Sequence, residues 1–319
     1  MTETTVVIPN YNGLKYIDNC LKSLYRGTKI PDVILVDNGS RDGSRELVEE
    51  KYEKVRIIGF EENTGFSSAV NAGIRAASTE YVLLLNNDTE VDEALVENLE
   101  KALSGEPKAF SAGARMLRMD APELLDGAGD LYCALGWAFA RGKDKASNTY
   151  EKPCRIFSAC AGAALYRREV FEKIGYFDEN HFAYLEDTDI GYRANIYGYY
   201  NIYVPDARVY HAGSAVSGSR HNEFKVRLSS RNSIYLVYKN MPLLQILLNS
   251  PFLLTGFFIK TLFFCRKGMG SAYLKGLMAG VRLSADKKGR CCKVKFSFSH
   301  LKNYVWIQGQ LWLNVARRL

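Results

Sequence analysis

The run Tyr81-Val82-Leu83-Leu84-Leu85-Asn86-Asn87-Asp88 carries the strongest structural signal in this chain of 319 residues. Five apolar residues typical of a buried strand are followed at once by three short polar ones. The carboxyl ends of parallel strands form the binding crevice of an α/β sheet, so this strand would bring Asp88 to the edge where a ligand binds. A carboxylate there suits a divalent cation that holds a diphosphate. An Asx turn after the strand is the purely structural alternative.

The first hundred residues alternate between two periodicities. Short β-branched or Leu-rich runs predict strands at 6–9, 33–37, 55–60 and 81–86. Helical spacing predicts helices at 14–24, 44–52, 67–77 and 93–103. Asp92 is a candidate cap for the last of these helices. Strands that alternate with helices indicate βαβ units and a mostly parallel sheet, so we predict an α/β fold.

The pattern is less regular after residue 110. We predict strands at 110–117, 156–166 and 199–204, a helix at 168–174, and a loop at 122–153. A further helix is predicted at 224–238, followed by the apolar segment 243–265 with Lys260 as its single charge. This segment is long enough to span a bilayer, but Pro251 and Gly256 interrupt it. We therefore expect helices that lie in the membrane interface, with a true span or a soluble helical subdomain as the alternatives.

Charge is distributed unevenly along the chain. The net charge is +7, yet residues 236–319 hold 14 Lys or Arg against the single acid Asp286, which leaves the preceding 235 residues at −6. Bases mixed with large apolar residues suggest a surface that contacts anionic lipid headgroups. Nucleic acid is the competing partner, but no recognisable nucleic-acid-binding motif accompanies the charge. We predict a membrane surface, and no nucleic acid, as the partner of this segment.

The cysteines and the N-terminus bear on the compartment. The seven cysteines form no C-x-x-C pair, which argues against a disulfide framework or a zinc site and fits a reducing compartment. A strand-like run begins at Thr4 and leaves no room for a signal peptide, so we expect the part of the chain before the basic segment to be cytosolic.

Polar, turn-forming residues follow the other predicted strands as well. The first strand ends in PNYNG (9–13), the second ends in VDNGSRDGS (36–44), and the third leads to NTGF (63–66). These groups would meet Asp88 at one sheet edge. Asp37 can accept hydrogen bonds from a nucleobase N–H, with the Tyr11 ring beside it. The backbone N–H groups of 63–66 suit a phosphate or ribose, although a plain helix start explains them equally well.

Glu186, Asp187 and Asp189 place three carboxylates within four residues. Like charges this close raise at least one pKa, which is useful for a general base. Helix capping is the alternative, because acids are favourable at a helix N-terminus. Arg193 could pair with Asp189 or with a phosphate. His211 follows a strand-like segment and is a candidate metal ligand, although a lone histidine is more often a core or surface residue.

Six motifs together carry a family resemblance. VVIPNYNG, VDNGSRDGS, ENTGFSSAVNAGI, LLLNNDTEV, IGYFDENHFAYLEDTDIGYR and VYHAGS, in this order over about residues 4–214, resemble the family 2 glycosyltransferases, especially the bacterial rhamnosyltransferase-like branch. The resemblance implies a GT-A fold with a Rossmann-like, mostly parallel sheet in a domain at 1–222. The region 223–319 is then a basic, apolar, helical region that associates with the membrane. The reaction implied is sugar transfer with inversion at the anomeric carbon by a single displacement.

The resemblance also implies residue roles. Asp88 matches the metal-binding end of the family's D-x-D element, with Asn86 standing where many members carry Asp, and His211 completes the site for Mg²⁺ or Mn²⁺. Asp187 matches the catalytic base, which Glu186 and Asp189 would help to orient. The predicted contacts to the nucleotide-sugar donor are Pro9, Tyr11, Asn12, Asp37, Asn38, Ser40, Asn63, Gly65, Asn86, Asn87 and Arg193.

The expected substrates follow from the branch that the chain resembles. The donor is a dTDP- or UDP-sugar, with dTDP-L-rhamnose first, and the acceptor is a glycan or lipid-linked saccharide of cell-surface polysaccharide synthesis. The protein would work peripherally on the cytoplasmic face of the membrane. A sugar-nucleotide pyrophosphorylase is one alternative, but it needs a Gly-rich phosphate loop where this chain has Asn10-Tyr11-Asn12-Gly13. A non-catalytic glycan-binding protein is another, and Asp88, Asp187 and His211 together argue against it.

Overall fold

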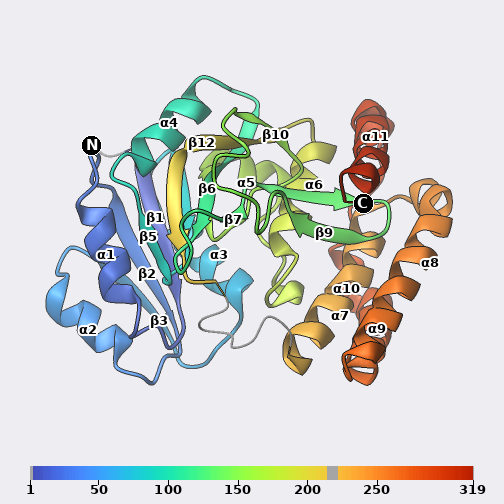
Figure 1. The fold of residues 1–319 in the computed structure, drawn as a ribbon, viewed down its shortest axis with the longest axis horizontal. Coiled ribbons are helices and arrows are strands. Elements are labelled where there is room, and N and C mark those ends of the chain that lie inside the picture. Colours follow the sequence, from blue (N-terminus) through green and yellow to red (C-terminus); the bar gives the residue numbers. More distant parts are fainter. Residues whose placement is uncertain (1–2, 214–221, 319) are drawn as a thin grey trace.

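The computed structural model describes residues 3–213 and 222–318, so Ser214, the last residue of the VYHAGS motif, lies outside the described residues. Its first part alternates between strands and helices (Figure 1). These elements are β1 (Thr4–Asn10), α1 (Ile17–Tyr25), β2 (Asp32–Asn38), α2 (Ser44–Lys51), β3 (Arg56–Phe60), α3 (Phe66–Ala76), β4 (Tyr81–Leu85), β5 (Thr89–Val91) and α4 (Leu95–Ser104). Strands β4, β1, β2 and β3 pair in parallel in that order, which confirms the predicted βαβ units.

The middle of the chain extends this sheet with strands of both directions. Its elements are β6 (Ala109–Arg118), β7 (Leu125–Gly127), β8 (Asp130–Cys133), β9 (Trp137–Ala140), β10 (Cys154–Ile156), β11 (Ala163–Arg167), α5 (Arg168–Ile174), η1 (Glu179–His181), α6 (Glu186–Ile196) and β12 (Tyr200–His211). β11 is antiparallel to both β4 and β6, whereas β12 runs parallel to β6. The result is a mixed, mostly parallel sheet in the order β10-β12-β6-β11-β4-β1-β2-β3.

Burial of both sheet faces explains why the strands read as continuous apolar runs. Val6 and Ile8 of β1 belong to a hydrophobic cluster that includes side chains of α1, α2 and α4. Val7, between them, belongs to a second cluster that includes side chains of α3, α5 and α6. Successive side chains of a strand point to opposite faces, so helices on both sides of the sheet can bury every residue of this strand.

Two expectations about the middle of the chain were wrong. The segment 122–153 is not only a loop, because it contains β7, β8 and β9, and β8 pairs with β9 as a separate hairpin. The single strand expected at 156–166 is instead β10 and β11, separated by a segment that bonds to β8. The strand expected at 199–204 is confirmed from Tyr200 and continues to His211 as β12, with a register irregularity around Pro205. These strands are short and depend on long-range partners, which local periodicity does not reveal.

The start of α4 also differs from the expectation. Asp92 does not cap this helix, because α4 begins at Leu95 and its cap residue, Ala94, makes no side-chain cap hydrogen bond. The carboxylate of Asp92 accepts a hydrogen bond from the N–H of Glu93 instead, at 3.2 Å.

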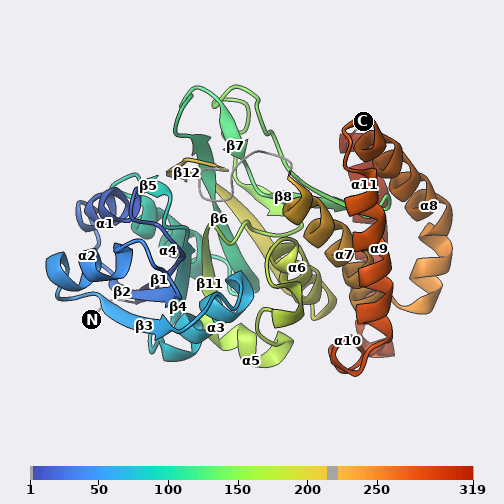
Figure 2. The ribbon, with the colours of Figure 1, turned by 90° about the horizontal axis from the view of Figure 1, so that it is seen from below.

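The C-terminal part is helical, and Figures 1 and 2 place it at the end of the molecule away from α1 and α2. Its elements are α7 (Glu223–Asn240), α8 (Leu243–Arg266), α9 (Gly270–Ala285), α10 (Lys287–Cys291), η2 (Phe298–His300) and α11 (Leu301–Arg318). α9 packs against α7 through glycines, since a Cβ atom on Gly276 would lie 1.9 Å from Ser230 Oγ. α8 is long and apolar enough to cross a membrane, and only 17% of its most apolar window is buried.

A third hydrophobic cluster joins the C-terminal helices to the rest of the chain. It contains Tyr132 of β8, Tyr192 of α6, Leu236 of α7, Leu253 of α8 and Leu311 of α11. The two parts therefore share buried contacts, and the division into domains at 1–222 and 223–319 stays a prediction.

Candidate active site

The polar ends of β1, β2 and β4 border one cavity of about 800 Å³. It lies at the carboxyl edge of the parallel strands, where ligands bind in open α/β sheets. The predicted residues that line it are Pro9, Tyr11, Asn38, Asn63, Gly65, Asn86, Asn87, Asp88 and His211. The structure therefore brings together residues separated by more than two hundred positions in the chain.

Asn12, Asp37 and Ser40 do not line this cavity, and their contacts with the donor stay predictions. Asp37 is only 2% exposed and accepts a hydrogen bond from Asn10 Nδ2 at 3.1 Å. Ser40 Oγ accepts hydrogen bonds from Asn10 Nδ2 and from the backbone N–H of Asn12, at 3.1 and 3.0 Å. Asn10, which the sequence analysis did not single out, thus ties together the two loops that follow β1 and β2. Asn87 fixes Asn10 in turn through a bond of 2.7 Å.

Asp88 and His211 face each other across 3.2 Å, measured from Oδ1 to Nε2. Pairing of β5 with the end of β12 sets this distance, and the N–H of Ala212 donates to the Asp88 carbonyl at 3.0 Å. The other ring nitrogen of His211, Nδ1, lies 2.8 Å from Asp126 Oδ2. Lys143 Nζ contacts the second oxygen of Asp126 at 2.6 Å. A carboxylate behind the imidazole fixes the ring, as is common for metal-ligating histidines.

This donor set fits a divalent cation. Adjacent ligand atoms of an octahedral Mg²⁺ lie about 3 Å apart, close to the separation of Asp88 Oδ1 and His211 Nε2. Burial lowers the pKa of His211, but its contacts with Asp126 and Asp88 outweigh burial and raise that pKa to about 9. Burial alone would raise the pKa of Asp126, whereas His211 and Lys143 hold it well below its usual range. The two carboxylates around His211 therefore favour positive charge at this position, which the proton on the imidazole supplies when no cation is bound. A cation that binds here would displace the Nε2 proton, and His211 would then be a neutral ligand.

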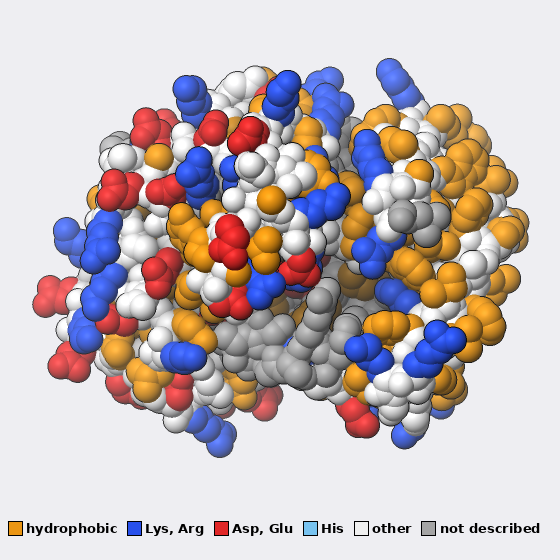
Figure 3. Space-filling model, in the orientation of Figure 1, with side chains coloured by type: hydrophobic (Ala, Val, Ile, Leu, Met, Phe, Trp, Pro, Cys, Tyr) orange, Lys and Arg blue, Asp and Glu red, His pale blue; other side chains and the backbone are white. Residues whose placement is uncertain are grey.

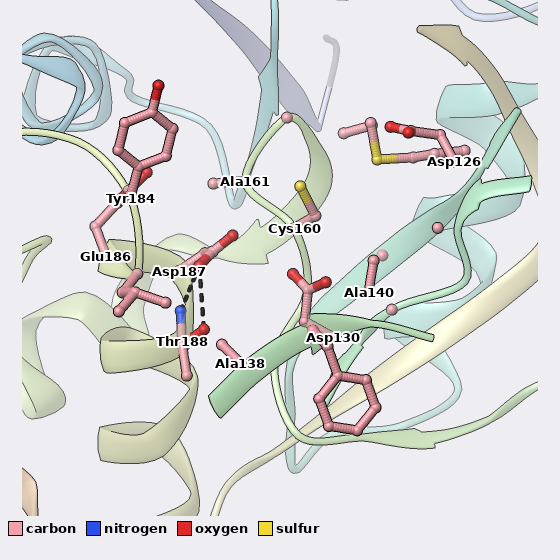
Figure 4. Close-up of a pocket in the computed structure, with 18 of the residues that line it drawn as sticks. Asp126, Asp130, Ala138, Ala140, Cys160, Ala161, Tyr184, Glu186, Asp187 and Thr188 are labelled. Atoms are coloured by element: carbon pink, nitrogen blue, oxygen red, sulfur yellow. Dashed lines mark hydrogen bonds between the residues drawn. The ribbon is translucent and has the colours of Figure 1, made fainter. Parts of the chain in front are cut away.

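Glu186 and Asp187 open α6 and line a second cavity of about 530 Å³ (Figure 4). The two cavities form one cleft, because they share the lining residues Phe66, Asn86, Asp126, Lys143, Ala183 and Tyr184. Asp187 Oδ1 accepts hydrogen bonds from the backbone N–H and the hydroxyl of Thr188, at 2.6 and 3.3 Å. Burial raises the pKa of both Glu186 and Asp187, and for Glu186 the charge of Asp187 adds to this effect. A carboxylate with a raised pKa in a cleft is a candidate general base.

The loop before α6 holds a strained backbone. Phe182, Tyr184 and Leu185 have φ angles of 62°, 70° and 67°, which residues other than glycine rarely adopt. Such residues cost about 1–3 kcal/mol each and persist where surrounding contacts enforce them. Asn232 of α7 supplies such contacts, because its Nδ2 donates to the carbonyls of Ala183 and Tyr184 at 2.8 and 2.7 Å. The first C-terminal helix thus positions the start of α6.

Asp189 and Arg193 do not line the cleft, and they form the ion pair that the sequence analysis gave as one alternative for Arg193. Asp189 is 0% exposed, and its Oδ2 contacts Lys239 Nζ at 2.8 Å and Arg193 Nη2 at 2.9 Å. Arg193 also donates to the backbone carbonyls of Ile174 and Gly175, at 2.6 and 2.8 Å. The helical period turns both side chains away from Asp187 and into the packing between α6 and α7.

The sequence analysis missed Asp126 and Asp130, which border the cleft from β7 and β8. Both stand in the segment Leu125-Asp126-Gly127-Ala128-Gly129-Asp130. The sequence feature that could have identified them is a pair of acids separated by glycines within a predicted loop. Their partners, His211 and Asp187, lie too far along the chain for spacing to reveal them.

Comparison with known proteins agrees with this geometry. The model of the family described as "Glycosyl transferase family 2" matches residues 5–175. The N-acetylglucosaminyl-diphospho-decaprenol L-rhamnosyltransferase of Mycobacterium tuberculosis is 27% identical over 264 residues, which cover 72% of this chain and 84% of that protein.

Solved structures of glycosyltransferases share the fold. The mannosyltransferase PcManGT from Pyrobaculum calidifontis, in complex with GDP-Man and Mn²⁺, has a TM-score of 0.55 at 17% identity and covers 97% of this chain and 84% of its own. S. aureus TarS 1-349, in complex with UDP-GlcNAc, has a TM-score of 0.57 at 16% identity, over 92% and 84% of the two chains. The fold is of the GT-A type, and the protein is a glycosyltransferase that uses a nucleotide sugar. Because the family model covers more than half of the residues, this chain belongs to glycosyl transferase family 2.

Proposed function

We propose that this protein transfers L-rhamnose from dTDP-L-rhamnose to a lipid-linked saccharide, with inversion, in the synthesis of a cell-surface polysaccharide. The observation that carries the proposal is a single cleft, with the Asp88–His211 pair at one end and Asp187 at the other. The mycobacterial relative is named as a rhamnosyltransferase, which supports rhamnose as the sugar. Its name also supports a polyprenyl-diphosphate-linked N-acetylglucosamine as the class of acceptor.

The proposed mechanism assigns separate tasks to the two ends of the cleft. Asp88 and His211 would hold Mg²⁺ or Mn²⁺, and a cation bound there neutralises the leaving nucleoside diphosphate. Tyr11 and Asn38, which line the same cavity, would contact the nucleoside. Asp187 removes the proton from the acceptor hydroxyl as its oxygen attacks the anomeric carbon, and the bond from that carbon to the diphosphate breaks. Glu186 lies beside Asp187 and would bind the acceptor sugar.

A donor panel tests the proposed sugar. We expect dTDP-L-rhamnose with Mn²⁺ to raise the melting temperature of the protein more than UDP-GlcNAc or GDP-mannose does, because a ligand that binds only the folded state stabilises it. Transfer to a short-chain polyprenyl-diphosphate N-acetylglucosamine then tests the acceptor. A larger shift with UDP- or GDP-sugars, together with transfer from them, would reject rhamnose while leaving the enzyme class intact.

The Asp88→Ala variant tests the proposed cation site. We expect it to abolish the Mn²⁺-dependent part of dTDP binding, because it removes the charged ligand while leaving the strand ends in place. His211→Ala should cause a smaller loss, since a neutral ligand contributes less charge than a carboxylate. Calorimetry of dTDP binding with and without Mn²⁺ measures both effects. Asp92→Ala, on the connection between β5 and α4, is the matched control, and unchanged metal-linked affinity in Asp88→Ala would remove Asp88 from this role.

We also propose that the helices α8 and α11 contact the cytoplasmic face of the membrane. Figure 3 shows hydrophobic side chains, interspersed with Lys and Arg, gathered over the C-terminal helices. Leu244 and Phe258 of α8 are 78% and 63% exposed, and Phe298 is 82% exposed. An apolar face with bases around it suits an anionic lipid surface, to which each base contributes roughly 1 kcal/mol.

The Leu244→Glu/Phe258→Glu variant tests this surface without deleting helices that also bury core residues. It should bind anionic phosphatidylglycerol vesicles less than the native chain does, and salt should weaken native binding because it screens the bases. Co-sedimentation measures both effects, with Ile30→Glu, an exposed position after α1, as the control. Equal sedimentation of the native and variant proteins would contradict the proposal. Extraction by detergent only, with resistance to salt, would instead identify α8 as a membrane span.

A further inference from the structure

Asp130 brings a second carboxylate to the proposed base. One carboxylate oxygen of Asp130, one of Asp187 and the Sγ atom of Cys160 all lie within 4.8 Å of one another. Figure 4 shows Asp130 and Asp187 approaching this point from different elements, the start of β8 and the start of α6. Two carboxylates this close repel each other when both are ionised, so the charge on one favours a proton on the other.

The surroundings decide which carboxylate holds that proton. Asp187 accepts hydrogen bonds from the N–H and the hydroxyl of Thr188 and stands in the first turn of α6, so its anion is stabilised. Burial and the charge of Asp187 together raise the pKa of Asp130 well above its usual value. Burial also raises the pKa of Asp187, but Thr188 and Asp130 act in the opposite direction. The asymmetry favours an ionised Asp187 beside a neutral Asp130.

Other titratable groups around the pair do not remove this asymmetry. Lys143 lowers the pKa of Asp130, but its Nζ is bonded to Asp126 at 2.6 Å. Burial raises the pKa of Cys160 on the loop before β11, of Tyr166 on β11, and of Glu186 on α6. Cys160 and Tyr166 are therefore neutral at pH 7, and the raised pKa of Glu186 disfavours a further negative charge beside Asp187.

We propose that Asp130 is a positioning residue that carries the proton of this pair and donates it in a hydrogen bond to Asp187, which keeps Asp187 ionised and directed into the cleft. The inference rests on the proposed role of Asp187 as the base. In the reaction, the acceptor O–H bond breaks and its proton passes to Asp187, while the proton of Asp130 stays in place. Product release then allows Asp187 to lose its proton to solvent.

Glu186 gives independent evidence that this end of the cleft receives a polar ligand. The residue is only 8% exposed and lines the same cavity as the pair. Its Oε2 atom has no hydrogen-bond partner within residues 3–213 and 222–318. An acceptor hydroxyl bound beside Asp187 would satisfy this atom, because a buried polar atom otherwise loses the hydrogen bonds it makes in water.

An infrared titration tests the protonation of Asp130 directly and needs no donor or acceptor. We expect the native protein, isotopically labelled only in its aspartate carboxyl groups, to show a protonated-carboxyl band at neutral pH that Asp130→Asn removes. Absence of the band, or its persistence in Asp130→Asn, would overturn the proposal. Loss of the band when Mn²⁺ is added without nucleotide would overturn it too, because Asp130, Cys160 and Asp187 would then be a cation site.

The pH dependence of turnover tests the positioning role. Release of dTDP from dTDP-L-rhamnose with Mn²⁺ should have an acid limb that reports ionisation of Asp187. Asp130→Ala removes a hydrogen-bond donor but no charge, so the pKa of Asp187 should rise and the acid limb should move up by about one to two pH units. Asp130→Asn keeps a neutral donor and should restore the acid limb toward the native position.

If Asp130 were charged, both variants would remove a negative charge, and the acid limb of the pH profile would move to lower pH. This shift is opposite to the expected one and would overturn the proposal. Both variants should fold, since the backbone of Asp130 keeps its bonds to Ser158, of 2.9 and 3.2 Å. Equal melting temperatures check this, with Asp32→Asn on the exposed start of β2 as the control. If dTDP-L-rhamnose is not turned over at all, the proposed function fails, while the infrared titration still decides the state of Asp130.

Discussion

Asp187→Asn should lower the rate of sugar transfer by about 10²–10⁴-fold while the affinity for the donor survives. This range is typical of the loss of general base catalysis, since Asn has the size of Asp but cannot accept the acceptor's proton. Thr188 can still bond to the side-chain oxygen, so the local structure at the start of α6 should be kept. The measurement is the transfer rate at saturating dTDP-L-rhamnose, with donor affinity determined separately by calorimetry.

Substitutions at the neighbouring acids separate this role from a structural one. Glu186→Gln should act mainly on the KM for the acceptor, because Glu186 lines the cavity and is proposed to bind the acceptor sugar. Asp189→Asn should act mainly on stability, since Asp189 is buried between Lys239 and Arg193. If Asp187→Asn kept native turnover and Asp189→Asn were inactive but folded, the base would be assigned wrongly. Native rates of sugar transfer in all three variants would show that these acids only cap the helix.

Lys239→Met should destabilise the fold by about 3–5 kcal/mol, the usual cost of breaking a buried ion pair by removing one partner. Lys239 Nζ contacts Asp178 Oδ2 at 2.7 Å and Asp189 Oδ2 at 2.8 Å, and all three side chains are at most 6% exposed. The variant leaves Asp189 with Arg193 and Asn240 as partners. It leaves Asp178 without its ion pair to Lys239 but with the Tyr235 hydroxyl as a donor. Urea denaturation measures the change in the free energy of unfolding.

A double variant and the pH dependence check the cause. Lys239→Met/Asp178→Asn removes one charge of each sign and should recover part of the lost stability. Burial alone would raise the pKa of Asp178 and Asp189, but Lys239 helps to hold both below 3.8. A carboxylate whose pKa is lowered by folding adds stability at pH values above its unfolded pKa. This contribution is lost as the pH falls through the folded pKa. If Lys239→Met changed the free energy of unfolding by less than about 1 kcal/mol, the ion pairs of Lys239 with Asp178 and Asp189 would not be important for stability.

The sequence alone determined the alternation of strands and helices and the location of Asp88 at the end of a strand. Both follow from the local order of residues. The spacing of apolar residues distinguishes helices from strands, and a polar residue directly after an apolar strand lies at the sheet edge. The start of α6 at Glu186 agrees with the capping alternative, because acids are favourable at a helix N-terminus. The pairing of Asp189 with Arg193 was also local, but the side of α6 that faces the cleft was not, since it depends on which elements pack against the helix.

Only the tertiary structure decided which polar side chains meet. Asp126 contacts His211 across 85 residues, because β7 and β12 both pair with β6. Lys239 reaches Asp189 across 50 residues through the packing of α7 on α6. Asp130 faces Asp187 because β8 and α6 both bond to the segment before β11, at Ser158 and Phe157. The physical reason is common to all three: each contact depends on how distant elements pack, and the period and spacing of residues along the chain carry no information about that packing.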